Sequence, residues 1–171
     1  YFQELLKIAI EAGDTRQTAE KFLVTLRQQF VFDNVAVYLQ DEATGTLEIV
    51  YARAVGRAKN AEADADWGET FASQVLAHGK LLLRDPEAGA SPDDRLSQAY
   101  LLGIPLRNDG LIGALVFVRF GGPAYEQEHR MMATLAAELL SVMFERTAWK
   151  KTHRELRDLK MQMQLQEDFV S

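Results

Sequence analysis

After Pro123 the chain contains neither glycine nor proline, and this constrains its fold more than any other feature. Glycine and proline are the residues that most often end or kink a helix. From about residue 125 the apolar residues recur at helical spacing. The sequence therefore predicts one unbroken helix from about 125 to the end of the chain. At 1.5 Å per residue, such a helix is roughly 65 Å long.

The first half of this predicted helix has a wide apolar face. Its members are Met132, Leu135, Ala136, Leu139, Leu140, Met143 and Phe144. A face of this width is typical of a helix that packs on its own domain or on a partner domain. We therefore expect residues 1–146 to form one domain that includes the N-terminal helices.

From residue 149 the apolar stripe is narrow and carries no charge, although the segment around it is highly charged. Its members are spaced alternately by three and four residues: Trp149, Thr152, Leu156, Leu159, Met163, Gln166 and Val170. Such a stripe predicts the seam of a parallel coiled coil between two copies of the chain, in which the polar Thr152 and Gln166 set the register. The alternative is a helix folded back on its own domain. Residues 147–171 are thus expected to form a long C-terminal coiled-coil helix.

Upstream of this helix, helical and strand periods alternate. Helical spacing over about 4–30 is followed over 34–54 by the period of two that is typical of a β-hairpin. The polar, acidic stretch 55–67 is expected to be a loop. Residues 68–78 are expected to form a helix that stops at Gly79.

The middle of the chain predicts three more strands. A short apolar strand is expected at 81–83, and the segment 91–94 has the residues of a helix start, a serine followed by proline and two acids. Strands over about 98–107 and 111–120 are joined by Asn108-Asp109-Gly110, residue types that tolerate the positive φ of a tight hairpin. This order of elements predicts an α+β domain with an antiparallel sheet flanked by helices.

Composition excludes several classes of protein. The formal net charge is −6, which does not favour nucleic-acid binding. The chain has no cysteine, and this excludes disulfides, thiolate metal sites and a cysteine nucleophile. No apolar run reaches the roughly 18–20 residues that span a bilayer, and no signal peptide is recognisable. We therefore expect a cytoplasmic chain without membrane contact. Tyr1, Phe2 and Gln3 have the character of a tag remnant and carry no weight in the fold.

Three segments resemble motifs of GAF domains. The stretch 99–106 is an apolar strand that ends in Pro-Leu, and after a tight turn the stretch 110–117 opens with an Ile-Gly pair, as in the central hairpin of that family. The stretch 75–85 resembles the helix, glycine, strand and aspartate that precede this hairpin. The beginning of the last helix, from Tyr125, resembles the closing helix of the family. The resemblance covers about residues 14–146 and implies a GAF-like sensory domain.

The C-terminal stretch 164–171 resembles the beginning of the dimerisation helix of sensor histidine kinases. In that family this segment runs directly into the motif that bears the phosphoacceptor histidine. The resemblance implies a piece of a two-component sensor histidine kinase, whose partner is a response regulator. The piece itself is expected to be no enzyme, and to relay a small-molecule or neighbouring-domain signal through a parallel helix pair.

Resemblance to GAF domains also implies a small-molecule pocket between the sheet and the helices and loops across it. The candidates by position are Tyr51, Arg53, Trp67, Phe71, Asp85 and Tyr100. For each of them, core packing or surface exposure is the competing explanation. Bilin-binding members of the family often use a cysteine, and cyclic-nucleotide members use an Asn-Lys-X-n-Phe-Asp-Glu pattern; both are absent here. No cofactor is therefore expected, and the identity of any ligand is open.

The histidines and acids do not favour a haem or metal site. His78, beside Gly79, is nearest the expected pocket, but a histidine that satisfies the last carbonyls of a helix is a simpler interpretation than a haem ligand. His129 and His153 are expected on a charged, solvated helix surface. The acidic stretch 62–69 departs from a calcium loop of the EF-hand type in the place of its glycine, and it lacks the bidentate glutamate.

Three other interpretations stay open. In the first, the chain is a ligand-free GAF module that only dimerises. In the second, it is a GAF sensor that feeds a cyclase or a transcription regulator. In the third, it is a small enzyme. GAF proteins that reduce methionine sulfoxide use cysteines, and this chain has none.

Overall fold

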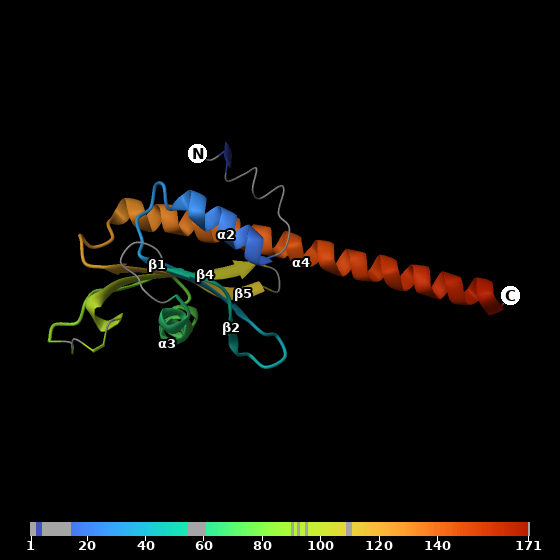
Figure 1. The fold of residues 1–171 in the computed structure, drawn as a ribbon, viewed down its shortest axis with the longest axis horizontal. Coiled ribbons are helices and arrows are strands. Elements are labelled where there is room, and N and C mark those ends of the chain that lie inside the picture. The colour runs from blue at the N-terminus through green and yellow to red at the C-terminus, as the bar shows by residue number, and fades with distance from the viewer. Residues whose placement is uncertain are drawn as a thin grey trace.

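The computed structural model describes residues 3–4, 15–54, 61–89, 91, 93–94, 96–108 and 111–170. A five-stranded antiparallel sheet has helices on both of its faces, and the last helix projects far beyond the sheet (Figure 1). The elements are α2 (Thr15–Leu26), β1 (Asn34–Gln40), β2 (Leu47–Ala54), α3 (Ala61–His78), β3 (Leu82–Arg84), the 3₁₀ helix η1 (Leu96–Gln98), β4 (Ala99–Asn108), β5 (Leu111–Phe120) and α4 (Gln127–Val170).

The sheet confirms the predicted α+β class with an antiparallel sheet between helices. Its strand order is β2-β1-β5-β4-β3. The two predicted hairpins, β1 with β2 and β4 with β5, are both present. The pairing of β1 with β5 joins the two hairpins into one sheet. Within the described residues, none of the helices is both long and apolar enough to cross a membrane.

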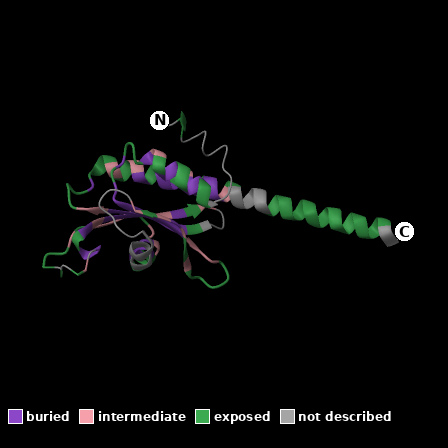
Figure 2. Ribbon diagram, viewed as in Figure 1, coloured by how far each residue is buried: buried purple, intermediate pink, exposed green. Residues whose placement is uncertain are grey.

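Each face of the sheet has its own apolar core. On one face, α2 and α4 cover residues such as Leu102, Leu115 and Phe117. On the other face, α3 covers Leu101 and Val116 through residues such as Phe71 and Val75. The buried residues therefore gather along the sheet and on the inward sides of the helices, whereas residues 152–168 of α4 are exposed (Figure 2).

A bulge in the hairpin of β1 and β2 changes which residues share a face. Val37 pairs with Tyr51 and Tyr38 pairs with Ile49, so Val50 has no partner of its own in the register. A bulge of this kind reverses the alternation of side chains along the strand. As a result Tyr51 joins the core under α2 and α4, whereas Leu47 packs on the α3 side. In a regular strand the two would lie on one face.

Two predicted local features are wrong. The stretch 61–67, expected as part of a loop, is the first part of α3. Alanine and glutamate favour helices, and acids near a helix N-terminus are stabilised by the helix dipole, so polarity there does not imply a loop. Residues 55–60 lie outside the described residues.

The expected helix start at Ser91 is the second correction. The hydroxyl Oγ of Ser91 accepts a hydrogen bond from the backbone N of Asp93 at 3.3 Å, which forms a local turn rather than a helix. The helical turn begins later, as the short η1, where the carboxylate of Asp94 accepts a hydrogen bond from the backbone N of Ser97 at 3.3 Å. Asp94, not Ser91, therefore caps this element.

The predicted packed face of α4 is right except at one residue. Ala136, Leu140, Met143 and Phe144 are buried, but Leu135 is exposed over 44% of its surface. Leu135 lies one position before Ala136, and 100° of helical rotation takes it out of the core. From 152 to 168 every residue of α4 is exposed. The predicted division of the chain into a domain over residues 1–146 and a coiled-coil helix over 147–171 stays a prediction.

Gly113 explains part of the motif that resembles the GAF hairpin. A Cβ atom at this position would lie 2.2 Å from the backbone oxygen of Tyr38 on the neighbouring strand. Backbone cannot retreat as a flexible side chain can, so only glycine fits between β1 and β5 here.

We predict that Gly113→Ala destabilises the domain by about 3 kcal/mol or more, because the sheet has to shift to admit the methyl group. Gly79→Ala is the control: Gly79 has a φ of 76°, but in the part of the chain that the structure describes no atom lies within 4 Å of where its Cβ would be. Its replacement should cost only about 1–2 kcal/mol, for the left-handed backbone. Urea denaturation of both variants tests this, and equal losses would contradict the close approach.

Candidate functional site

A pocket of about 350 Å³ opens between α2 and the edge strand β2. Apolar side chains form much of its wall, beside two arginines, a glutamine and a tyrosine. The lining residues are Leu23, Val24, Arg27, Gln28, Phe32, Val35, Tyr51 and Arg53. An apolar surface with a few directed polar groups is typical of small-ligand sites.

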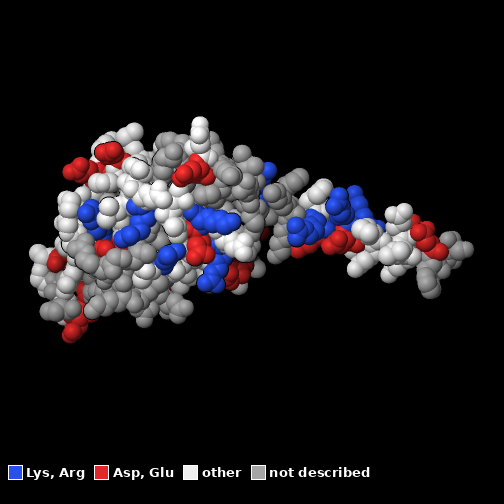
Figure 3. Space-filling model, turned by 45° about the horizontal axis from the view of Figure 1, so that its top comes forward, with Lys and Arg blue, Asp and Glu red and all other residues white. Residues whose placement is uncertain are grey.

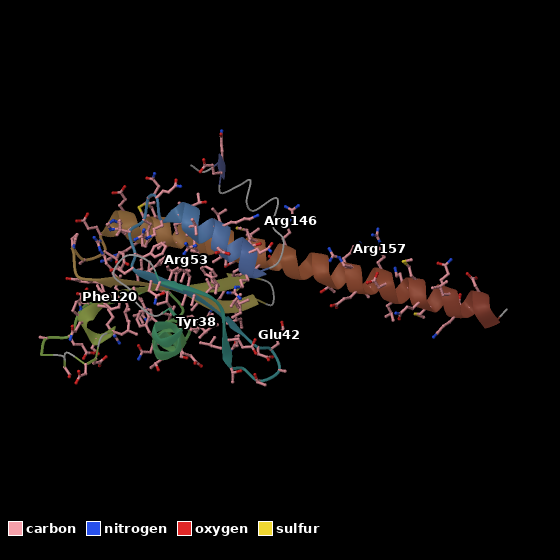
Figure 4. All side chains as sticks on the ribbon, in the orientation of Figure 1. Tyr38, Glu42, Arg53, Phe120, Arg146 and Arg157 are labelled. Carbon is pink, nitrogen blue, oxygen red and sulfur yellow. The ribbon has the colours of Figure 1, made fainter. Side chains whose placement is uncertain are left out.

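Two arginines give the pocket its charge. The Nε of Arg27 donates a hydrogen bond to the backbone oxygen of Phe32 at 3.2 Å, and its guanidinium carbon lies 5.9 Å from the centre of the Phe32 ring. The Nη1 of Arg53 lies 3.6 Å from a carboxylate oxygen of Glu20 (Arg53 is labelled in Figure 4). Because both partners of this ion pair are about half exposed, the pair adds little stability.

The hydroxyl of Tyr51 is the buried polar group of this pocket. Tyr51 is 6% exposed, and among the described residues its hydroxyl has no hydrogen-bond partner that meets normal geometry. Burial raises the pKa of Tyr51, and the neighbouring Arg53 guanidinium opposes that rise. The phenol thus stays neutral at physiological pH. Together with the two guanidinium groups it suits a small ligand that has an apolar body and an acidic or acceptor group.

The six predicted ligand residues do not form one site. Tyr51 and Arg53 line the pocket between α2 and β2. Tyr100 is half-buried on the same face of the sheet, but on β4, which is separated from β2 by two strands. Asp85 is exposed after β3. The side chain of Trp67 lies outside the described residues.

Phe71 lies on the opposite face of the sheet, in the core beneath α3. Its ring would contact a Cβ on Gly103, and the guanidinium of Arg84 lies 5.9 Å from its centre. Arg84 in turn donates a hydrogen bond to the backbone oxygen of Leu96 at 3.1 Å. Phe71 is therefore part of a packed core that also ties β3 to η1. Ligand contact by any of the six residues stays a prediction.

His129 is placed differently from the prediction of a solvated surface residue. Its Nδ1 accepts a hydrogen bond from the backbone N of Glu126 at 3.0 Å, which caps the start of α4. Its ring also packs edge-on against Phe30, with 5.7 Å between ring centres. His78 ends α3, and His153 is exposed on the projecting helix. Among the residues that the structure describes, no three His, Cys, Asp or Glu side chains gather as a metal site requires.

The predicted seam residues lie on the projecting half of α4. Thr152, Leu156, Leu159, Met163 and Gln166 are all exposed. The side chains of Trp149 and Val170 lie outside the described residues. Basic and acidic side chains are interspersed along this half, with uncharged surface between them (Figure 3). Arg157 is one of the charged residues that point into solvent there (Figure 4).

Two polar contacts fix the ends of strands β4 and β5, and the sequence patterns did not predict them. The carboxylate of the buried Asp33 accepts a hydrogen bond from the backbone N of Phe120 at 2.7 Å, which closes the end of β5 beside β1. The side-chain amide of Asn108 donates to the carboxylate of Glu145, which ties the end of β4 to α4. Both contacts join residues far apart in the sequence, so no local signal predicts them.

The family model of the GAF domain matches residues 12–145. The chain therefore belongs to the GAF family, whose domains typically serve signalling and sensing. No protein of curated function matches the sequence closely enough to count as a relative.

Solved structures with the same fold serve several functions. A methyl-accepting chemotaxis protein, residues 122–287, has a TM-score of 0.66 and 16% identity, over 86% of this chain and 98% of that one. The free methionine-R-sulfoxide reductase of Neisseria meningitidis has a TM-score of 0.61 and 19% identity, over 86% of this chain and 89% of that one. A domain assigned to a two-component sensor histidine kinase of Sinorhizobium meliloti has a TM-score of 0.58 and 19% identity, over 81% of this chain and 95% of that one. At these identities the similarity is one of fold.

We predict that Arg27→Met and Arg53→Met differ in their effect on stability. Loss of Arg27 removes a hydrogen bond and a cation–π contact, and should lower the free energy of unfolding by about 1 kcal/mol. Loss of Arg53 breaks a half-exposed ion pair and removes the guanidinium beside Tyr51, and it should cost less than about 0.5 kcal/mol. Urea denaturation measures both. A larger loss for Arg53 would mean that Arg53 has a structural role and is not available to a ligand.

Proposed function

We propose that this chain is the sensory GAF module of a two-component sensor histidine kinase and passes its signal through a parallel pair of α4 helices. The observation that carries the proposal is the apolar stripe on the projecting half of α4. Leu156, Leu159 and Met163 are each more than half exposed, although they share one side of the helix. A monomer leaves this stripe in water, and a second helix would bury it.

The kinase assignment is supported by the C-terminal stretch 164–171, which resembles the beginning of a kinase dimerisation helix. A domain assigned to a sensor histidine kinase is among the structures that share the fold. In this arrangement the chain has no catalytic residues of its own and acts in the cytoplasm, and a response regulator is the partner of the complete kinase.

The route of the signal follows from the continuity of α4. The helix is unbroken from Gln127 to Val170, so its packed half and its free half rotate together. A ligand or neighbouring domain that favours one packing of Leu139 and Met143 on the sheet would thereby favour one arrangement of the helix pair. A difference of a few kcal/mol between two arrangements is enough to change their populations.

The pocket between α2 and β2 is our candidate for the ligand site. It holds Tyr51 and Arg53, and it lies against α2, which packs on α4. A ligand there could therefore alter the position of α4. The rival function is a ligand-free GAF module that only dimerises and relays a neighbouring sensor. A native mass spectrum of freshly purified protein separates the two, since only the sensor carries a bound small molecule.

Two further rivals concern the output and the chemistry. A cyclase or transcription regulator as output is less well supported than a kinase because of the stretch 164–171. The similar fold of a methionine-R-sulfoxide reductase raises the question of an enzyme. The cysteine-based chemistry expected of such reductases has no counterpart in a chain without cysteine.

We predict that the chain is a dimer at tens of micromolar and that Leu156→Glu weakens the dimer by roughly a hundredfold, because a charge would be buried in the seam. The control is Met161→Glu. Met161 is exposed over 57% of its surface, Leu156 over 53%, but Met161 lies off the stripe. Light scattering and sedimentation equilibrium measure the dissociation constants. A strictly monomeric chain, or equal effects of the two variants, would refute the seam.

We also predict a dependence on helical phase in the complete kinase. One residue inserted after Thr152 rotates the downstream helix by about 100°, whereas an inserted heptad restores the phase. The single insertion should change autophosphorylation strongly and the heptad insertion much less. If both variants behave as the unmodified kinase does, the helix is a passive tether.

A further inference from the structure

The pocket between α2 and β2 is a positively charged site in an acidic chain. The whole chain has a formal net charge of −6. Among the described residues that line the pocket, however, two are arginines, Arg27 and Arg53, and none is Asp or Glu. Arg16 also lies close enough to Tyr51 to interact with it electrostatically. Apolar walls strengthen the field of such charges. The pocket therefore attracts an anion.

The hydroxyl of Tyr51 offers a hydrogen bond that a ligand can accept. Tyr51 is 6% exposed and lines the pocket, and its hydroxyl has no partner in the part of the chain that the structure describes. A buried hydroxyl without a partner has lost its bonds to water and regains a bond when an acceptor arrives. Arg53 is two positions further along β2, on the same side of the strand, and its guanidinium lies beside Tyr51. A carboxylate can accept hydrogen bonds from a phenol and a guanidinium at the same time.

The contact between Arg53 and Glu20 leaves the guanidinium available to a ligand. The Nη1 of Arg53 lies 3.6 Å from a carboxylate oxygen of Glu20, a separation too long for a good hydrogen bond. Both side chains are about half exposed, so water screens their attraction. A ligand carboxylate inside the pocket can approach the same guanidinium more closely and in less water.

The size and the wall of the pocket define the rest of the ligand. Its volume of about 350 Å³ holds roughly a dozen water molecules, or an organic molecule of about ten to fifteen non-hydrogen atoms. Leu23, Phe32 and Val35 form buried, apolar parts of the wall. A nucleotide is too large for this space, and acetate or inorganic phosphate would leave the apolar wall in contact with water. The pocket fits an acid with an apolar body.

We propose that the pocket between α2 and β2 binds a small organic monocarboxylate, whose carboxylate accepts hydrogen bonds from the Tyr51 hydroxyl and the Arg53 guanidinium. Its apolar body packs against Leu23, Phe32 and Val35. This names the ligand class of the pocket in the proposed function, and it rests on that assignment of the pocket. The site lies on the face of the sheet that α2 and α4 cover, and the core beneath α3 takes no part in it.

The first test compares acids with their neutral amides. Isothermal titration calorimetry of the unmodified chain uses phenylacetate, 4-methylpentanoate, phenylacetamide and 4-methylpentanamide. At least one acid should bind with a dissociation constant below about 1 mM, and at least about tenfold more tightly than its amide. Acetate and inorganic phosphate, which have no apolar body, should bind about tenfold more weakly than that acid. If neither acid binds, or if each amide binds as tightly as its acid, the proposal is wrong.

The second test removes the two hydrogen-bond donors. Tyr51→Phe should weaken binding of the acid about tenfold without lowering the thermal unfolding midpoint of the free chain, because the hydroxyl has no partner to lose among the described residues. Arg53→Met should abolish the preference for acid over amide. Arg157→Met is the control: it makes the same change of charge on the exposed half of α4 (Figure 4) and should leave the affinity unchanged. If Tyr51→Phe lowers stability but not affinity, the hydroxyl is structural and the proposal is wrong.

The third test changes an acid beside the pocket. Glu20→Gln removes the competing carboxylate from Arg53 and should tighten binding of the acid about threefold. Glu42→Gln removes the same charge from the exposed turn between β1 and β2 (Figure 4) and should have no effect. Equal effects of the two variants would mean that the overall charge of the chain, and not the Arg53 site, governs binding.

The fourth test fills the pocket. Val24 lines it and is exposed over 43% of its surface, so Val24→Phe should be tolerated by the fold and should weaken binding at least about tenfold. Ile112, on β5, is exposed over 42%, and Ile112→Phe should leave binding unchanged. If the acid binds equally well to both variants, it binds elsewhere and the proposal is wrong.

The outcomes separate this site from the function proposed above. If the chain is a dimer that responds to Leu156→Glu but no acid binds, the helix pair stands and the carboxylate site is wrong. If acids bind as expected to a chain that is strictly monomeric, the carboxylate site stands and the helix pair is wrong.

Discussion

The packing of α4 against α2 and strand β4 is the interaction on which the rest of the structure depends. Ala133, Ala136 and Ala137 are buried on the inward face, and their small side chains let the helix lie close to its neighbours. Met143 and Phe144 belong to the same core, next to Glu145, which binds Asn108 at the end of β4. Since the same helix continues to Val170, the core of the domain and the projecting rod are one mechanical unit.

Local patterns carry enough information for much of this fold. The hairpin of β4 and β5 is predictable because a period of two meets a turn of Asn, Asp and Gly, and both signals lie within a few residues. The length of α4 is predictable because nothing in its sequence interrupts it. The Ile-Gly pair near the start of β5 is explained by a tertiary contact and not by a local one. Gly113 makes room for the backbone of Tyr38, which belongs to a strand far away in the chain.

The grouping of residues in the candidate ligand site could not be predicted from local patterns. The bulge at Val50 turns Tyr51 and Arg53 toward α2, and a bulge leaves no local mark in this sequence. Phe71, which is grouped with them by its position in the sequence, lies on the other face of the sheet because α3 covers that face. The acidic stretch 61–67 was wrongly predicted as a loop because acids are common both in loops and in the first turn of a helix. Leu135 shows the limit of apolar patterns, which do not tell an inward face from an outward one.

A signalling helix pair has to be weak enough to respond. In the proposed dimer, each copy contributes Leu156, Leu159 and Met163 to the free seam, each already about half exposed. Their burial contributes roughly 1 kcal/mol per side chain, and the polar Thr152 and Gln166 subtract from it. Over the six side chains of the two copies this amounts to roughly 6 kcal/mol before those polar residues are counted, which corresponds to a dissociation constant on the order of tens of micromolar. A seam of leucine alone would pair more tightly but would define its register less well. A signalling helix must also move together with its domain. The hydrogen bond from Asn108 to Glu145 serves this need, because it ties α4 to the end of β4 at the point where the helix leaves the domain.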